Sequence, residues 1–248
     1  MCIIGAVMKE HPDYPLIIAA NRDEFIARPA EQAHWWEEGF VAGKDIKQGG
    51  TWIGISREGK IGAVTNIRNP KEHNSFPYSR GVLVPAWLTG GDLEAYMNKK
   101  RSFAGFNLLY GTVDKLHYET NGNGKSETIE KGIFALSNAV LGKEWPKTAF
   151  LKKELTAAPG MNKEELIEHL FKALSRNDPF PETELPDTGV GLELEKSLSP
   201  PYINMTEYGT RCSTVILVSK NHQVTFIERS YRPERGEVKF HFHLEKNS

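Results

Sequence analysis

Short apolar segments that recur in pairs around brief polar breaks constrain the fold of this chain most. Residues 2–9 and 16–20 flank HPDYP, a break that contains two prolines. Three further pairs follow the same pattern around REG, VD and KNH, namely 49–56 with 60–66, 106–112 with 115–121, and 213–219 with 223–229. Two apolar runs joined by a short polar break are typical of a β-hairpin. The sequence therefore predicts mainly antiparallel sheets built from consecutive hairpins, with one more strand over 133–138.

Helical patterns are confined to two regions between these strand groups. The first covers 81–88 and 92–100, and the second covers 145–155 and 162–176. In the last of these, apolar residues recur at helical spacing behind Asn162, a favourable N-cap residue. Groups of strands separated by groups of helices indicate an α+β fold. Seven or more strands are enough for two sheets, so we expect a sandwich in which helices cover two antiparallel sheets.

The chain is predicted to form one domain over residues 1–248. A proline-rich stretch at 177–189 resembles a linker, but too few strands follow it for a separate domain, so we expect a surface loop there. The charged share of 25% and the net charge of −1 are those of an ordinary globular protein and argue against nucleic-acid binding. The N-terminal apolar run is too short to span a bilayer and lacks the flanks of a secretory signal. We therefore predict no membrane span and a cytoplasmic location, while the oligomeric state is not predicted by any feature.

The chain contains two cysteines, Cys2 and Cys212, which are too few for a disulfide framework or a structural zinc site. His241 and His243 have the spacing of strand-borne metal ligands, but no cysteine or carboxylate cluster accompanies them, and a solvated strand is the favoured interpretation. We therefore predict no metal and no cofactor. Cys2 is unusual, because a thiol at the start of a buried-looking strand gains nothing from ordinary packing and risks oxidation.

A cluster of four polar residues follows the second predicted strand: Asn21, Arg22, Asp23 and Glu24. In a hairpin they should lie close to Cys2, because the end of the second strand pairs with the start of the first. One interpretation is a capped turn in which the polar side chains satisfy backbone groups. The other is a reactive site, in which Arg22 lowers the pKa of the thiol while Asp23 or Glu24 holds Arg22 or an α-ammonium group.

Removal of Met1 would change the chemistry of Cys2. A small second residue permits that removal, and Cys2 then gains a free α-amine with an ordinary pKa of about 7.7 to 8.0. Such an amine can act as the base for its own side chain, as in N-terminal nucleophiles.

Other strand ends also carry polar side chains. Asn66 ends one strand, Ser137 and Asn138 end another, and the strand near the C-terminus opens with Arg211, Ser213 and Thr214. Asparagine is a common turn residue, so each position alone is weak evidence. Together, the amides of Asn66 and Asn138 offer the donors that a tetrahedral oxyanion requires. Arg211 is suited to a substrate carboxylate, a phosphate or the cysteine, and the alternative is a salt bridge to Glu207 or a surface position.

Several short motifs occur in order along nearly the whole chain: NRDE at 21–24, GGTW at 49–52, TNIR at 65–68, LSN at 136–138 and YGTRCSTV at 208–215. In this combination the chain resembles the NRDE family, the family of the transport and Golgi organisation protein 2. The resemblance implies a fold like that of N-terminal nucleophile hydrolases, an αββα four-layer sandwich with two stacked, mainly antiparallel sheets between helical layers. The family itself is associated with haem or acyl-lipid handling rather than with an established hydrolysis.

Within those hydrolases, the relevant similarity is to the cysteine branch, the choloylglycine hydrolase and penicillin V acylase-like enzymes. These cut non-peptide amide bonds with a cysteine that is exposed by loss of the initiator methionine. By this resemblance Cys2 matches the nucleophile, Arg22 and Asp23 lie where the group has an arginine and an aspartate, Asn66 and Asn138 resemble its oxyanion-side positions, and Arg211 resembles its late arginine. The spacing in ANRDEF leaves open which of Asn21, Arg22 and Glu24 occupies each equivalent position. Contacts to the substrate are predicted for Asn21, Glu24, Trp52 and Ser213.

Two functions are consistent with these residues. The first is an amidohydrolase in which Cys2 attacks a linear amide or related acyl group, its α-amine relays the proton, and Asn66 and Asn138 hold the oxyanion. The second is a binding or carrier protein on the same scaffold, in which the NRDE cluster and Arg211 form a polar mouth over an apolar pocket. Aromatic residues available to line that pocket are Trp35, Trp36, Phe40 and Trp52. Its ligand would be acyl-CoA, another acylated metabolite, or haem held by Cys2 or a histidine.

Overall fold

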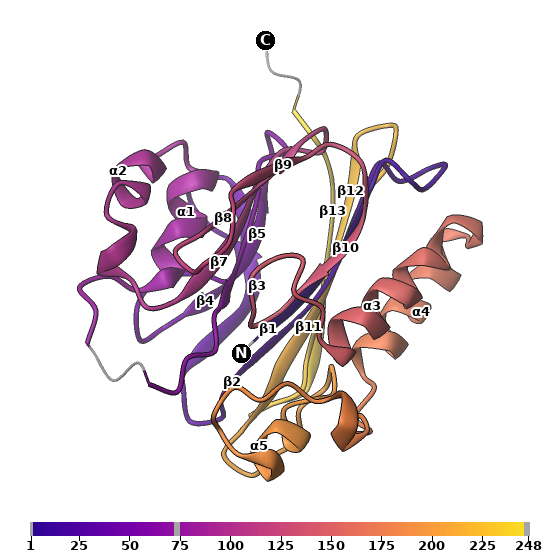
Figure 1. Cartoon of the computed structure of the whole chain (residues 1–248). Helices are drawn as coiled ribbons and strands as arrows, with labels where there is room; N and C mark the ends of the chain where they lie inside the picture. The colour runs from indigo at the N-terminus through magenta and orange to yellow at the C-terminus, as the bar shows by residue number, and fades with distance from the viewer. Residues whose placement is uncertain (1, 72–74, 246–248) are drawn as a thin grey trace.

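The computed structural model describes residues 2–71 and 75–245, and the thirteen described strands form two stacked sheets (Figure 1). The six-stranded sheet has the order β10 (Gly132–Leu136), β1 (Cys2–Met8), β2 (Leu16–Phe25), β11 (Tyr208–Val218), β12 (Gln223–Ser230), β13 (Gly236–His243). The seven-stranded sheet runs in chain order: β3 (Ala30–Trp35), β4 (Phe40–Asp45), β5 (Ile53–Ser56), β6 (Ile61–Asn66), β7 (Phe106–Gly111), β8 (Leu116–Thr120), β9 (Glu127–Ile129). All pairings between these described strands are antiparallel.

Helices cover the outer face of each sheet. On the seven-stranded sheet, α1 (Leu83–Leu88) packs on β5, β6 and β7, and α2 (Leu93–Met97) packs on α1. On the six-stranded sheet, α3 (Pro146–Thr156) contacts β1 and β10, and α4 (Lys163–Leu174) contacts β2 and β11. Figure 1 shows the resulting order of helices, sheet, sheet and helices, with α5 (Leu192–Ser197) at the end of the sandwich near the start of β1. Short 3-10 helices complete the chain: η1 (Arg80–Val82), η2 (Lys100–Ser102), η3 (Ala158–Gly160) and η4 (Glu182–Glu184).

The sandwich follows from how residues alternate along the central strands. Ile4 of β1 points into the core between the two sheets, and its neighbour Ile3 points toward α3 and α4. A strand that is buried on both faces requires apolar residues at successive positions. For this reason 2–8 and 16–20 form continuous apolar runs, and the α+β class with two sheets could be predicted from the sequence.

The predicted hairpins and the four predicted helical segments are confirmed. Helix α4 begins behind Asn162, whose side chain accepts a hydrogen bond from the Glu165 backbone N–H at 3.1 Å. The stretch 177–189 contains one 3-10 turn and is otherwise irregular, as expected for a loop. His241 and His243 lie exposed on the edge strand β13, in agreement with a solvated strand. In 2–71 and 75–245, no helix is both long and apolar enough to cross a membrane.

Several elements differ from the prediction. The edge strands β3 and β9 carry mostly exposed or partly exposed residues, β4 has an apolar run of only three residues at 40–42, and α5 is only six residues long, so none of these four was predicted. Strand β2 was expected to end at Ala20 but continues to Phe25, and β11 begins at Tyr208 rather than at Ser213. Both extend because they pair with each other over this length. The NRDE cluster is therefore part of a central strand and not a turn.

Candidate active site

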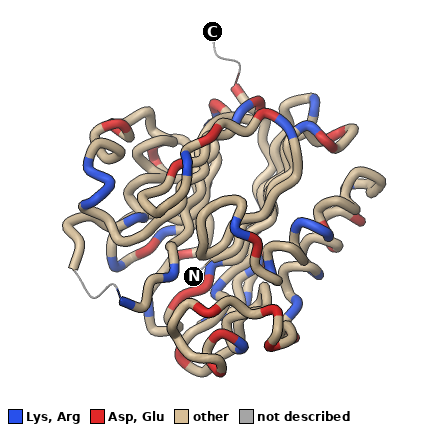
Figure 2. Tube along the Cα trace, viewed as in Figure 1, with Lys and Arg blue, Asp and Glu red and all other residues tan. Residues whose placement is uncertain are grey.

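A cavity of about 540 Å³ opens at the end of the sandwich where β1 begins and β6 ends. Figure 2 shows that acidic and basic residues gather around the start of β1. Six of the predicted site residues line the cavity: Cys2, Arg22, Asp23, Glu24, Trp52 and Asn66. The other four lie outside its lining: Asn21, Asn138, Arg211 and Ser213.

Cys2 lies beside the NRDE cluster as the hairpin predicts. It is directly opposite Arg22 in the ladder between β1 and β2, and residues opposite each other in an antiparallel pair share a face. Burial raises the pKa of the Cys2 thiol, and the Asp23 charge raises it further. Arg22 acts in the predicted direction and lowers this pKa, but it does not outweigh burial. The thiol is therefore the resting form, and a nearby base is needed to make it a nucleophile.

Arg22 is held from the opposite sheet and not by Asp23 or Glu24. Its Nη2 lies 3.2 Å from Oδ2 of Asp45, at the end of β4. Arg28 binds the same carboxylate, with Nε 2.5 Å from Oδ2 and Nη2 3.2 Å from Oδ1. Burial raises the pKa of Asp45, but the hydrogen bond and charge of Arg28, with the charge of Arg22, lower it overall. Glu24 pairs with Arg28 at 3.8 Å.

The GGTW motif places an aromatic ring beneath Arg22. A β-carbon on Gly50 would lie 2.3 Å from the Gly81 carbonyl oxygen, so only glycine permits this approach. A β-carbon on Gly43 would lie 2.2 Å from the Trp52 ring, which needs that space. The Arg22 guanidinium carbon is 4.4 Å from the ring centroid of Trp52, a cation–π contact. The motif thereby fixes the guanidinium at the cavity wall.

Asp23 is buried and bound on the side of the sheet away from Arg22. Its Oδ1 accepts a hydrogen bond from the Thr210 hydroxyl at 2.6 Å, and its backbone carbonyl accepts one from the Tyr208 hydroxyl at 2.9 Å. Burial raises the pKa of the Asp23 carboxyl, while the charge of Lys147 and the bond from Thr210 oppose that rise. Burial also raises the pKa of Tyr208, so its hydroxyl stays protonated beside the cavity.

Asn66 and Asn138 lie in contact, but they occupy different layers. The Asn138 side chain is 1% exposed, and its Nδ2 donates to the Asn66 backbone carbonyl at 3.1 Å and to the Asn66 Oδ1 at 3.0 Å. Both N–H groups of Asn138 are therefore used by Asn66, which itself lines the cavity. Asn138 acts on the cavity through Asn66.

Asn21, Ser213 and Arg211 support the architecture around the cavity. The Asn21 amide donates to the carbonyls of Leu174 and Pro201 at 2.8 and 2.9 Å, and its oxygen accepts from the Ser213 hydroxyl at 2.5 Å. Arg211 is 5% exposed and donates to three backbone carbonyls, those of Phe25, Arg28 and Arg232. It pairs with no carboxylate among the described contacts, so neither the Glu207 salt bridge nor the surface position holds.

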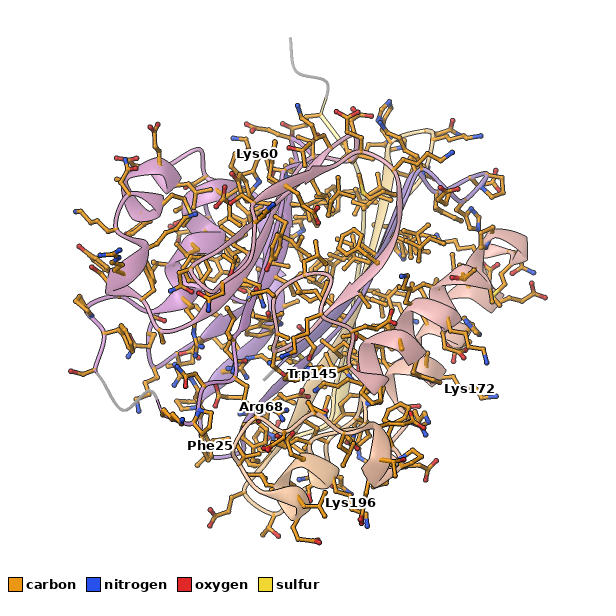
Figure 3. All side chains as sticks on the ribbon, in the orientation of Figure 1. Phe25, Lys60, Arg68, Trp145, Lys172 and Lys196 are labelled. Atoms are coloured by element: carbon orange, nitrogen blue, oxygen red, sulfur yellow. The ribbon has the colours of Figure 1, made fainter. Side chains whose placement is uncertain are left out.

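The wall of the cavity near α5 is apolar and anchored by a buried ion pair. Leu194 and Leu198 line the cavity from this segment. Glu195 Oε2 lies 2.5 Å from Arg68 Nη1, and both side chains are less than 10% exposed. The Arg68 guanidinium carbon is also 4.8 Å from the ring centroid of Trp145, and Figure 3 shows the two side chains next to each other. The ion pair fixes the segment that carries the two leucines.

Cys212 offers a contrast to Cys2. It lies opposite Arg22 on the other neighbouring strand, so its Cα is two strand spacings, about 10 Å, from that of Cys2, too far for a disulfide. Burial and the charge of Glu228 raise the pKa of its thiol well above the ordinary value.

Within the described ranges, no group of three histidine, cysteine or acidic side chains is close enough to hold a metal ion.

Sequence reasoning missed three residues at this site: Asp45, Lys147 and Tyr208. Tyr208 belongs to the YGTRCSTV motif and could have been selected with it. Asp45 lies in a short strand with no clear pattern, and Lys147 is an ordinary lysine in a predicted helix, so neither carries a signal in the sequence.

Comparisons with known proteins give the following matches. The chain matches the family described as Transport and Golgi organisation 2 over residues 1–233. It is 35% identical to the Transport and Golgi organization protein 2 homolog of Bos taurus, covering 97% of this chain and 98% of that one. It is 33% identical to the Mus musculus homolog, covering 93% of each. Among solved structures, it is similar to a Caenorhabditis elegans N-acylethanolamine-hydrolyzing acid amidase ortholog at 7% identity and a TM-score of 0.48, covering 87% of this chain and 92% of that chain.

Proposed function

The chain belongs to the Transport and Golgi organisation 2 family, and since membership does not name a reaction, we propose from its own site that it is a cysteine amidohydrolase of the N-terminal nucleophile type. The substrate class is a linear non-peptide amide or a related acyl group. One observation carries the proposal: a thiol at the start of a central strand opens onto a cavity beside a buried carboxyl group and an amide.

The proposed reaction begins with removal of Met1, a residue that lies outside those described. The free α-amine of Cys2 then takes the thiol proton, because the raised pKa of the buried thiol leaves it protonated at neutral pH. The thiolate attacks the substrate carbonyl carbon, and a tetrahedral oxyanion forms. We assign Asn66 the donor to that oxyanion, because it lines the cavity and its Oδ1 already accepts from Asn138, which leaves its N–H groups for the substrate.

Collapse of this intermediate breaks the C–N bond. The α-ammonium group returns its proton to the leaving amine, and the acyl group stays on Cys2 as a thioester. Water, deprotonated by the same α-amine, then attacks the thioester and releases the carboxylic acid and the free thiol. Asp23 adjoins Cys2, since its backbone N–H bonds the thiol, and we assign its carboxylate the task of orienting the α-ammonium group. Arg22 and Asp45 keep a fixed polar wall beside the thiol.

Hydrolysis of a panel of fluorogenic acyl amides tests the proposal. We expect the wild-type protein to hydrolyse at least one acyl amide and the Cys2→Ala variant to hydrolyse none. Cys212→Ala is the matched control, because that thiol is buried outside the cavity lining, and it should keep the wild-type rate. Equal rates for wild type and Cys2→Ala would contradict the proposed nucleophile.

A second function, binding or carriage of an acylated metabolite, is favoured by the apolar mouth of the same cavity. Phe25 is 59% exposed and Leu194 is 36% exposed, and both line the cavity (Figure 3 labels Phe25). Exposed apolar side chains at a cavity rim are typical of sites for apolar ligands. Acyl-CoA or an acyl lipid is the ligand class that fits.

Haem is the less suited ligand for this cavity. No histidine is present among the described residues that line it, and the candidate axial ligands there are Cys2, Met205 and Tyr208. Burial holds Cys2 in its thiol form and Tyr208 in its phenol form, whereas haem iron takes these two ligands as anions. Equilibrium titration with an acyl-CoA and with haem, on wild type and on Cys2→Ser, separates the two functions. Unchanged acyl-CoA affinity in Cys2→Ser, with no turnover of any acyl amide by wild type, would favour the carrier.

A further inference from the structure

Lys147 is a buried cation directly behind the candidate active site. It is 2% exposed and lies in the first turn of α3, where the helix dipole disfavours a positive charge. Burial lowers the pKa of its ammonium group to about 8. A charged lysine in such a position destabilises the fold. Packing alone therefore does not explain Lys147, and its contacts point to a role at the site.

The contacts of Lys147 lead to the cavity wall. Its Nζ donates to Oδ1 of Asn138 at 3.4 Å and to the Leu198 carbonyl at 3.2 Å. The Ser137 hydroxyl lies 3.0 Å from the same Oδ1 and 2.8 Å from the backbone carbonyl oxygen of Cys2, and its single proton serves one of these two oxygens at a time. An ammonium group can only donate, so Lys147 fixes the orientation of the Asn138 amide with its oxygen toward Nζ and its Nδ2 toward Asn66. Because Asn66 Oδ1 accepts from that Nδ2, the Asn66 N–H groups are turned to the other side.

The charges around Lys147 come from four elements of the chain. Asp23 on β2, Cys2 on β1 and Glu195 on α5 favour its ammonium form, and Arg68, which follows β6, opposes it. The interaction with Cys2 is mutual, so the ammonium favours the thiolate just as the thiolate favours the ammonium. Lys147 is thus coupled to the nucleophile by charge and to Asn66 by hydrogen bonds.

We propose that Lys147 is a positioning residue of this site, a proposal that rests on the proposed hydrolase function. The Lys147 ammonium group stabilises the Cys2 thiolate. Through Asn138, it also orients the Asn66 amide toward the substrate carbonyl oxygen. Lys147 does not touch the substrate, because it lies outside the cavity lining. The role differs from simple core filling, since it requires a positive charge at this position.

The test is the pH profile of Cys2 alkylation by iodoacetamide, measured by mass spectrometry on the native protein. It needs no substrate. In Lys147→Met, a side chain of similar length without charge, we expect Cys2 to react about tenfold more slowly at neutral pH, because loss of the ammonium group raises the pKa of the thiol. Lys147→Arg keeps the charge and should restore part of the rate. Lys152→Met, on the exposed side of the same helix, is the control and should match wild type.

A second measurement uses the wild-type protein alone, should the Lys147 variants fail to fold. Two coupled groups of opposite charge lose their protons over a wider pH range than a single group. The wild-type alkylation profile should therefore be broader than a single titration curve. That of Lys147→Met should be narrower than that of wild type, because the α-amine of Cys2 is then the remaining group coupled to the thiol. A single-group profile in wild type, or identical midpoints in wild type and Lys147→Met, would overturn the proposal.

Turnover separates this proposal from the proposed function. If wild type hydrolyses no acyl amide but the alkylation profiles differ as expected, the hydrolase function fails and the coupling between Lys147 and Cys2 stands. If wild type is active, Lys147→Met should lower kcat about tenfold with KM unchanged, because only the transition state uses the oriented amide. An unchanged kcat in a folded Lys147→Met variant would overturn the positioning role while the hydrolase function stands.

Discussion

Breaking the buried ion pair between Arg68 and Glu195 should destabilise the protein strongly. Their side chains are 7% and 4% exposed, and Glu195 also accepts hydrogen bonds from the Thr188 N–H and hydroxyl at 2.8 and 2.5 Å. Replacing Glu195 by leucine leaves Arg68 buried without this carboxylate, and removing one partner of a buried pair costs about 3 to 5 kcal/mol. For a chain of this length, 1 kcal/mol corresponds to about 2 to 4 °C in Tm. We therefore expect Tm to fall by roughly 6 to 20 °C, from the same relation.

A double-mutant cycle in urea separates the pair from its surroundings. Arg68→Met alone should cost about as much as Glu195→Leu, and the double variant should recover most of the loss, because a buried pair is often replaceable by apolar side chains. The matched control is the exposed pair of Lys196 and Glu182, at 2.9 Å, whose disruption should leave the free energy of unfolding almost unchanged because solvent screens it. A loss below 1 kcal/mol in Glu195→Leu, or strictly additive losses in the double variant, would refute the reasoning.

Three further predictions concern the site. Asn66→Ala should lower kcat for an acyl amide by about 10² to 10³ with little change in KM. A rise in KM of that size with kcat unchanged would instead show that Asn66 acts in substrate binding. The substitution Lys147→Met removes a lysine whose pKa in the folded protein, about 8, lies below its ordinary value of 10.5. Between those values only the unfolded chain binds the proton, so the unfolding free energy of wild type should rise with pH by about 3 kcal/mol relative to the variant; parallel pH curves from urea unfolding would contradict this. Gly50→Ala should lower Tm and loosen Trp52, because its β-carbon would clash with the Gly81 backbone, and unchanged Trp fluorescence with unchanged Tm would argue otherwise.

The sequence predicts the sheets better than it predicts their edges. Strands β1 and β2 are buried on both faces and form apolar runs that are easy to recognise. The edge strands β3 and β9 have no such run, because each pairs on one side only and leaves most of its residues partly or fully exposed. The same applies to the extension of β2 through the NRDE cluster, which depends on its pairing with β11. Local sequence indicates a turn there, and tertiary pairing overrides it.

At the site, the sequence predicts the nucleophile and its neighbours but not their partners. The closeness of Cys2 to Arg22 follows from hairpin geometry alone. Asp45 lies on the other sheet, and its contact with Arg22 depends on how the two sheets stack, which no short motif encodes. Asn138 was expected to hold the oxyanion together with Asn66, and only the three-dimensional packing shows that it lies one layer behind.

The most direct test of the central claim is the mass of the N-terminal peptide of the protein isolated from its source cell, before and after incubation with an acyl amide that it hydrolyses. The account predicts a peptide that begins at Cys2, without Met1, and a transient acyl adduct on that cysteine. Quantitative retention of Met1 in a protein that still hydrolyses the amide would contradict it, because Cys2 would then lack the α-amine that serves as its base.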